Sequence, residues 1–309
     1  MRIENIINSI TLTQDEKESL FGFFPDGVVV LDLETTGLSP LVDKIIEISA
    51  VKFTPSGVEV FDELVNPKME IPQYTIDIHG IQDHQVADKA TIDEVLPRFL
   101  DFCGNLPLIA HNAKFDTGFL VFDMHQNGIQ AKRNKVFCTI KMSRFAFPKM
   151  KSHKLGNLCK ELEIPLENHH RALDDAVADL MVLAKCLKAS ASNRILKESY
   201  MFQLRDFRKL ESWDIPDHLK ILLTKIEKQQ VIEIKYKGGT VKNKERPIRP
   251  ISLLPMPGGH VLYAHCLLSN IYKSFALRKI SHVKELNAEE IKYYLETHTK
   301  KFDKKEGLD

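Results

Sequence analysis

The fold is decided by residues 27–37, which read GVVVLDLETTG. The β-branched apolar run predicts a buried strand, and the threonines and glycine after Glu34 predict a turn that ends it. Asp32 and Glu34 are two positions apart, so in a strand they project from the same face. Two carboxylates at a buried strand end repel each other unless a cation offsets their charge, and Mg²⁺ prefers carboxylate oxygen. A solvated strand end without a metal is the alternative.

Further strands and helices are expected on both sides of this stretch. The first 25 residues predict a helical extension, with a capping box at Thr13 and Glu16. Three strands in succession, followed by alternating strands and helices, predict an α/β sandwich with a mixed sheet. We expect strands at 45–53, 58–65 and 106–110, and helices at 115–128 and 172–188.

A second acidic position follows the strand that ends at Ala110. His111 and Asn112 come next, and Asp116 falls in the first turn of the expected helix. A carboxylate there is favoured by the helix dipole, and the carboxyl ends of strands are common places for active sites. Asn112 either caps the helix or positions a substrate.

A third acidic position lies at residues 168–176, which read NHHRALDDA. His170 is expected just before a helix and Asp175 within its first turns. Beside an acidic cluster, a histidine can take a proton from an attacking water. A structural histidine at the helix entry is the alternative.

Together the three segments resemble the DEDD exonucleases of the DnaQ type, in the form that has histidine in the third motif. The matching motifs are DLETTG at 32–37, HNAKFD at 111–116 and HRALDDA at 170–176, with IHGI at 78–81, CT at 138–139 and HKLGNL at 153–158 between them. The resemblance covers about residues 27–190. It implies an RNase H-like fold, in which helices flank a mixed sheet, and a 3′–5′ exonuclease.

The same resemblance implies roles for individual residues. Two divalent cations, Mg²⁺ or Mn²⁺, would be held by Asp32, Glu34, Asp116 and Asp175. His170 would act as general base on the attacking water. The residues expected to contact substrate are Thr35, His79 and Asn112.

The two halves of the chain differ in charge. Residues 1–196 contain 21 Lys and Arg against 27 Asp and Glu, and residues 197–309 contain 22 against 15. An acidic half joined to a basic half predicts two parts with different roles. Short strands separated by Gly-Gly and Pro-Gly-Gly turns in the basic half predict a small β-barrel.

This second half resembles a WYL domain, an Sm-like β-barrel of bacterial regulators. The matching segments are VIEIKY at 231–236, RPIRPISL at 246–253, LYAHC at 262–266 and FALRKI at 275–280. The tripeptide that names the family is here HVL at 260–262, and an expected arginine is Lys279. The resemblance implies a nucleotide-like or nucleic-acid ligand, contacted by Arg246, Lys273 and Lys279, with Arg249 and Arg278 nearby. A solvated basic face and a protein–protein surface are the alternatives.

The expected organisation is a helical extension at 1–26, the exonuclease domain at 27–190, a helical linker at 191–228 and the WYL-like domain at 229–309. The five cysteines are widely spaced, and neither a signal peptide nor a long apolar run is visible, which favours a cytoplasmic protein without disulfides. The leading hypothesis is an exonuclease acting on single-stranded nucleic acid, with DNA favoured over RNA. A regulator without catalysis and an editing subunit of a polymerase are the alternatives, and the oligomeric state cannot be predicted.

Overall fold

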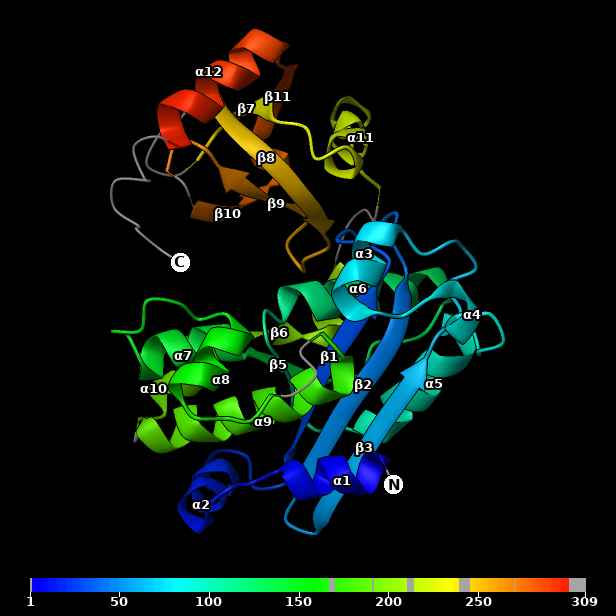
Figure 1. Cartoon of the computed structure of the whole chain (residues 1–309), viewed down its shortest axis with the longest axis vertical. Helices are drawn as coiled ribbons and strands as arrows, with labels where there is room; N and C mark the ends of the chain where they lie inside the picture. The colour runs from blue at the N-terminus through cyan, green and yellow to red at the C-terminus, as the bar shows by residue number, and fades with distance from the viewer. Residues whose placement is uncertain are drawn as a thin grey trace. The chain divides into compact units, whose positions relative to one another are not determined.

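The computed structural model describes residues 2–166, 170–190, 192–209, 214–238, 245–269 and 271–299. The chain divides into two compact units (Figure 1). Unit 1 comprises Met1–Gly37 and Asp43–Phe207, and unit 2 comprises Leu38–Val42 and Arg208–Asp309. The short segment after the DLETTG motif therefore belongs to the second unit.

A six-stranded mixed sheet forms the centre of unit 1, which confirms the expected sheet type. The strand order is β3-β2-β1-β4-β5-β6. β1 pairs with β2 antiparallel and with β4 parallel, so it lies inside the sheet. The strands are β1 (Val28–Thr35), β2 (Ile45–Thr54), β3 (Gly57–Leu64), β4 (Leu108–Ala110), β5 (Lys135–Cys138) and β6 (Tyr200–Gln203).

Helices flank this sheet, as the RNase H-like resemblance implies. Figure 1 shows α9 crossing the sheet beside β1 and β2, and its apolar stripe packs against Val28, Val30 and Val51. Asp32 and Glu34 continue the face of Val28 and Val30 along β1, so they lie on the α9 side of the sheet. The helices of this unit are α1 (Arg2–Ser9), α2 (Gln14–Phe23), α3 (Gln73–His79), α4 (Asp83–Val86), α5 (Ile92–Cys103), α6 (Lys114–Gln126), α7 (Thr139–Ala146), α8 (Leu155–Glu161), α9 (Ala172–Ala189) and α10 (Arg194–Ser199).

The N-terminal extension has the local structure that its sequence predicts. Thr13 accepts a hydrogen bond from the backbone N–H of Glu16, and the Glu16 carboxylate accepts one from the backbone N–H of Thr13. This capping box begins α2, whose Leu20 is fully buried in the main core of unit 1. The extension is thus part of that core.

The segment expected as a helical linker at 191–228 differs from the expectation. It contains β6, which pairs antiparallel with β5 and opposes Phe202 to Val136. Phe202, Leu204 and Phe207 are all buried. A segment with three large apolar side chains gains more from covering a sheet edge than from remaining solvated, so it completes the sheet of unit 1.

Unit 2 contains a five-stranded antiparallel sheet in the order β10-β9-β8-β7-β11. A closed barrel is not confirmed, because in the part of unit 2 that the structure describes β10 and β11 remain the two edges. The connection between them is a single 3-10 turn, η3, which carries the chain from one edge to the other. The strands are β7 (Ile232–Tyr236), β8 (Glu245–Leu254), β9 (Val261–Cys266), β10 (Ile271–Ala276) and β11 (Ile280–Glu285).

The core of unit 2 is formed by one face of this sheet and by α11. Ile234, Ile248, Leu262 and Phe275 lie in it, and Leu41 packs against it. The other elements of unit 2 are α11 (Ile221–Glu227), α12 (Ala288–Thr299) and the 3-10 turns η2 (Asp217–Leu219) and η3 (Leu277–Lys279). The 3-10 turn η1 (Leu204–Lys209) begins in unit 1 and ends in unit 2. Among the helices described in either unit, none is both long and apolar enough to cross a membrane.

Candidate active site

Three carboxylates meet at the end of β1 that leads into the turn. Asp32 and Glu34 are half-buried on that strand, and Asp175 is buried in the first turn of α9. One oxygen atom from each lies within 4.8 Å of the others. β1 and α9 are far apart in the sequence. Tertiary packing therefore brings together carboxylates that are separated by more than 140 residues along the chain.

Asp116 is the fourth carboxylate of this region. It lies in the first turn of α6 and is only 2% exposed. Its Oδ2 atom is buried and has no hydrogen-bond partner within the described residues. Such an orphaned oxygen is costly beside other carboxylates, and a divalent cation would satisfy it.

The electrostatics of the cluster agree with a site built for cations. Burial, followed by repulsion from Glu47, Asp175 and Asp116, raises the pKa of Glu34 to about 9. Burial also raises the pKa of Asp116 to about 8, although backbone hydrogen bonds at Asp116 and Leu33 oppose the shift. Carboxylate oxygens are the ligands that Mg²⁺ and Mn²⁺ prefer, so the donor set fits the expected ions.

The pKa of Asp32 is also raised, well above its ordinary value. Burial is the largest cause, and the charge of Asp116 is the next. The charges of Glu34, Asp175 and Asp179 raise this pKa further. A cation bound beside Asp32 would oppose this repulsion.

Asp179 is a buried acid that the sequence reasoning missed. It is 2% exposed and lies one helical turn beyond Asp175 on α9. Its Oδ1 atom is 3.6 Å from Nδ1 of His111, whose Nε2 is 3.0 Å from the carbonyl oxygen of His153. The i, i+4 spacing from Asp175 was the available signal, because that spacing repeats a helix face.

His170 lies at the entry of α9, where it was expected. Its side chain is exposed, and its backbone has a φ of 71° in the left-handed region. Its backbone N–H donates to Oδ2 of Asp175 at 3.2 Å. The main chain at His170 is therefore held against the acidic cluster while the imidazole stays accessible to solvent.

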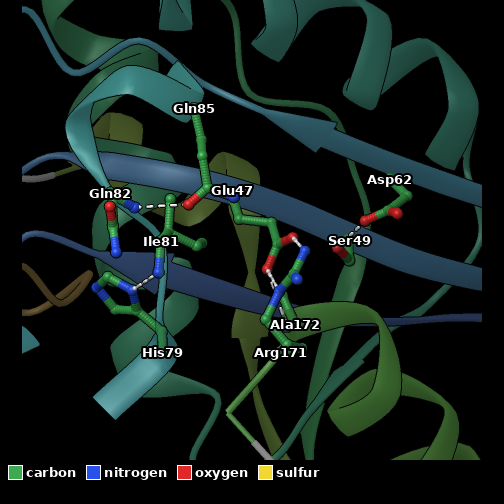
Figure 2. Close-up of polar contacts among 9 residues, drawn as sticks. All are labelled: Glu47, Ser49, Asp62, His79, Ile81, Gln82, Gln85, Arg171 and Ala172. Carbon is green, nitrogen blue, oxygen red and sulfur yellow. Dashed lines mark hydrogen bonds and ion pairs between the residues drawn. The ribbon is translucent and has the colours of Figure 1, made fainter. Parts of the chain in front are cut away.

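Figure 2 shows a second missed residue, Glu47, which joins β2 to the start of α9. Its side chain is only 1% exposed, and β-sheet register places it directly opposite Glu34. Nη2 of Arg171 donates to Glu47 Oε1 at 2.6 Å, and the backbone N–H of Ala172 donates to Oε2 at 3.1 Å. A buried carboxylate thus satisfies a free N–H at the helix N-terminus and pairs with the residue before it.

The three residues expected to contact substrate differ in environment. Thr35 is buried, and its hydroxyl donates to the carbonyl oxygen of Gly37 at 2.5 Å, so it also holds the turn. Asn112 is exposed with a φ of 63°, and α6 begins after it without a side-chain cap, so the capping alternative is wrong.

His79 is the third of these residues. Its Nδ1 accepts from the backbone N–H of Ile81 at 3.0 Å (Figure 2), which leaves the proton of a neutral ring on Nε2. Nε2 is buried and has no hydrogen-bond partner within the described residues. Burial, with smaller effects of Arg171 and His170, lowers the pKa of His79 to about 4, so it is a neutral hydrogen-bond donor at neutral pH.

The basic residues expected to contact a ligand in the C-terminal half differ in how far they are buried. Arg246 is 3% exposed, and its Nη2 donates to the carbonyl oxygen of Gly238 at 3.4 Å, so it is held inside unit 2. Lys273 is half-buried on β10, whereas Arg249, Arg278 and Lys279 are exposed.

A mixed α/β sheet that carries crowded carboxylates at the end of its central strand defines the RNase H-like class of metal-dependent nucleases. Within that class, the exonuclease (RNase_T) family model matches residues 29–183, which is half of the chain. The chain belongs to this exonuclease family. The family is one of hydrolases that use two divalent metal ions, and the acidic cluster is consistent with such a pair.

The similar proteins include long bacterial polymerases. The chain is 36% identical over 263 residues to the PolC-type DNA polymerase III of Clostridium perfringens, an overlap of 81% of this chain and 18% of the polymerase. It is 32% identical over 284 residues to that of Caldanaerobacter subterraneus, covering 91% and 20%. The chain thus spans about a fifth of the length of these relatives. Exonuclease X in complex with 5′ overhanging duplex DNA is 27% identical, with a TM-score of 0.44 over 54% of this chain and 94% of the other.

Proposed function

We propose that this chain hydrolyses phosphodiester bonds from the 3′ end of single-stranded nucleic acid, with DNA as the favoured substrate. The single observation that carries the proposal is the meeting of Asp32, Glu34 and Asp175 within 4.8 Å, inside the segment that matches the exonuclease family. The similarity to DNA polymerases favours DNA over RNA.

In this proposal the four carboxylates Asp32, Glu34, Asp116 and Asp175 hold two divalent ions. When bound, the ions stabilise the charge on the attacking and leaving oxygens of the phosphodiester. His170 accepts a proton from the attacking water, a role supported by its exposed side chain and by the backbone N–H that it donates to Asp175. The buried and mutually repelling carboxylates support the role of cation ligands.

The substrate contacts that we propose are Thr35, His79 and Asn112. His79 offers an N–H donor that nothing in the described residues satisfies, which suits a phosphate or sugar oxygen. Asn112 is exposed at the N-terminal end of α6. Thr35 supports the turn after β1, so its contribution to substrate is through the backbone position of Gly37 as much as through its hydroxyl.

An editing role beside a polymerase is the second candidate function. It is favoured by one observation, that the relatives of this chain are PolC-type DNA polymerases of which it matches about a fifth. A regulator without catalysis is the weaker alternative, because the acidic set and His170 are all present.

For the C-terminal half, we propose a WYL-like domain at 229–309, after an exonuclease domain at 27–190, that binds nucleic acid or a nucleotide, with a protein partner as the alternative. The exposed cations Arg249, Arg278 and Lys279, with Lys273, are the proposed contacts. Arg246, being buried, would act by shaping the site. A cytoplasmic location remains part of the proposal.

The test is a gel assay on 5′-labelled single-stranded DNA and RNA of matched sequence, with Mg²⁺, Mn²⁺ or EDTA. We expect a ladder that shortens from the 3′ end and disappears in EDTA and in Asp175→Ala. Asp174→Ala is the matched control, because it removes the neighbouring, less buried acid. Retained binding with no shortening of either strand would support the regulator instead.

A further inference from the structure

The sheet of unit 2 has two very different faces. Leu262, Ala264 and Cys266 of β9 lie in the apolar core. The alternating residues Tyr263 and His265 therefore project from the opposite face, where both are half-exposed. The apolar core does not include these side chains.

Neighbouring strands extend this pattern into a patch. In the strand register, His265 lies opposite Tyr272 of β10 on one side and Arg249 of β8 on the other. The Tyr272 ring centroid is 5.1 Å from that of His265 and 5.7 Å from that of Tyr263, and the two tyrosine rings are tilted by only 21°. Tyr272 is 60% exposed. We call Arg249, Tyr263, His265 and Tyr272 the aromatic face.

Another part of the same side of the sheet is already covered. The hydroxyl of Tyr294 on α12 donates to Oε2 of Glu233 on β7 at 2.6 Å, and Glu233 is 3% exposed. In Figure 1, α12 lies beside the β7 side of this sheet. The aromatic face on β8, β9 and β10 is thus the part that α12 leaves exposed.

The segment that carries this face is basic, and the register places one of its cations, Arg249, on the face itself. From residue 246 to residue 284 the sequence contains no Asp or Glu, although it contains six Lys or Arg and three His. A phosphodiester backbone gains from such a stretch because its contacts release bound counterions. Two copies of the chain would instead bring like charges together, which disfavours self-association through this surface.

We propose that the aromatic face binds single-stranded nucleic acid, with bases stacked on Tyr272 and Tyr263 and a phosphate held by Arg249. Exposed rings favour a single strand because the bases of a duplex already stack on one another. The inference rests on the proposed function for the identity of its partner and deepens it by naming the surface that holds the strand.

The test measures binding without cleavage. A fluorescein-labelled oligothymidine of about 20 nucleotides, long enough to contact more than one ring, is titrated with the full chain in EDTA and followed by anisotropy. We expect Tyr272→Ala to weaken binding by about 5- to 150-fold, since base stacking on one ring has this effect. Tyr272→Phe keeps the ring and should bind like the wild type. Tyr293→Ala removes a tyrosine that is 62% exposed on α12 and is the matched control.

Arg249→Ala should reduce the slope of binding against salt by about one phosphate contact. Wild-type affinity in Tyr272→Ala, with an unchanged melting curve, would overturn the proposal. So would a dimer that Tyr272→Ala dissociates without weakening oligonucleotide binding. If Tyr272→Ala weakens binding but the wild type never shortens DNA, the aromatic face stands and the proposed exonuclease activity fails.

Discussion

Glu47→Gln tests how the start of α9, the helix that carries Asp175, is held in place. Glutamine keeps the size of the side chain and one acceptor oxygen, but removes the negative charge. The Glu47 carboxylate accepts a hydrogen bond from Arg171, at 2.6 Å, and one from the backbone N–H of Ala172, at 3.1 Å. Those two residues begin the helix that carries Asp175. The substitution therefore changes the position of the acidic cluster without replacing any of the proposed metal ligands.

The magnitude follows from burial. Hydrogen bonds to a charged group contribute about 1.5–3 kcal/mol, more than neutral ones. Glu47 is 1% exposed, but the side chain of Arg171 is 29% exposed and can regain water when its partner is neutral. The neutral amide would also repel Glu34 less than the carboxylate does, which offsets part of the loss. We therefore expect the free energy of unfolding to fall by about 1–3 kcal/mol.

The catalytic effect should exceed what partial unfolding explains. A misplacement of about 1 Å at a reacting centre costs up to about 100-fold in rate. We expect kcat on a short single-stranded DNA to fall about 10- to 100-fold, with KM nearly unchanged and more Mg²⁺ needed for half-maximal rate. The assays are steady-state cleavage at a temperature where both proteins are folded, and urea unfolding.

Glu63→Gln is the matched control. Glu63 lies on β3 of the same sheet and also pairs with an arginine, Arg98 of α5. Its side chain is 32% exposed and that of Arg98 is 50% exposed, so the pair is largely solvated. The control should change the free energy of unfolding by less than about 0.5 kcal/mol and leave kcat unchanged. If Glu47→Gln behaved like this control, Glu47 would not position α9.

Three further outcomes are expected. Mg²⁺ at 100 times its Kd should stabilise the folded wild type by about 2.7 kcal/mol and so raise its melting temperature. The rise should be smaller in Asp116→Asn, and an unchanged melting temperature in the wild type would contradict the cation site. In EDTA, the raised pKa values of Glu34 (about 9) and Asp116 (about 8) mean that the folded state binds more protons than the unfolded state. Stability should therefore fall as pH rises from about 5 to 9, and a flat urea-unfolding profile would refute the assignment. Ile48→Ala, in the fully buried part of β2, should cost about 2–5 kcal/mol in urea unfolding, whereas Ile78→Ala, at a 53% exposed position, should cost under about 0.5 kcal/mol.

Much of the first unit could be predicted because its signals are local. The apolar run before Asp32 forms β1, and the capping box at Thr13 begins α2 as expected. The short strand β6 was missed because its four residues have no distinctive pattern of their own. They form a strand because β5 offers an open edge, and that edge exists only after the sheet has assembled.

The site shows the same division. The spacing of Asp32 and Glu34, and the motifs around Asp116 and Asp175, pointed to all four carboxylates. Glu47 and Asp179 were missed because each is an ordinary acid in its own segment. Glu47 has a structural role only because Arg171, 124 positions away, packs against it in the folded chain. Asp179 affects the pKa of Asp32 only because α9 packs against β1.

Residue identity and short spacing were enough to predict the motifs, the sheet type and the carboxylates that fit a metal ion. Which of these groups interact electrostatically depends on the tertiary structure. Burial turns separate acids into a mutually repelling cluster, and strand register brings Arg249, His265 and Tyr272 into one row. Repulsion, register and desolvation all depend on distances between residues remote in the chain, and those distances exist only in the folded state.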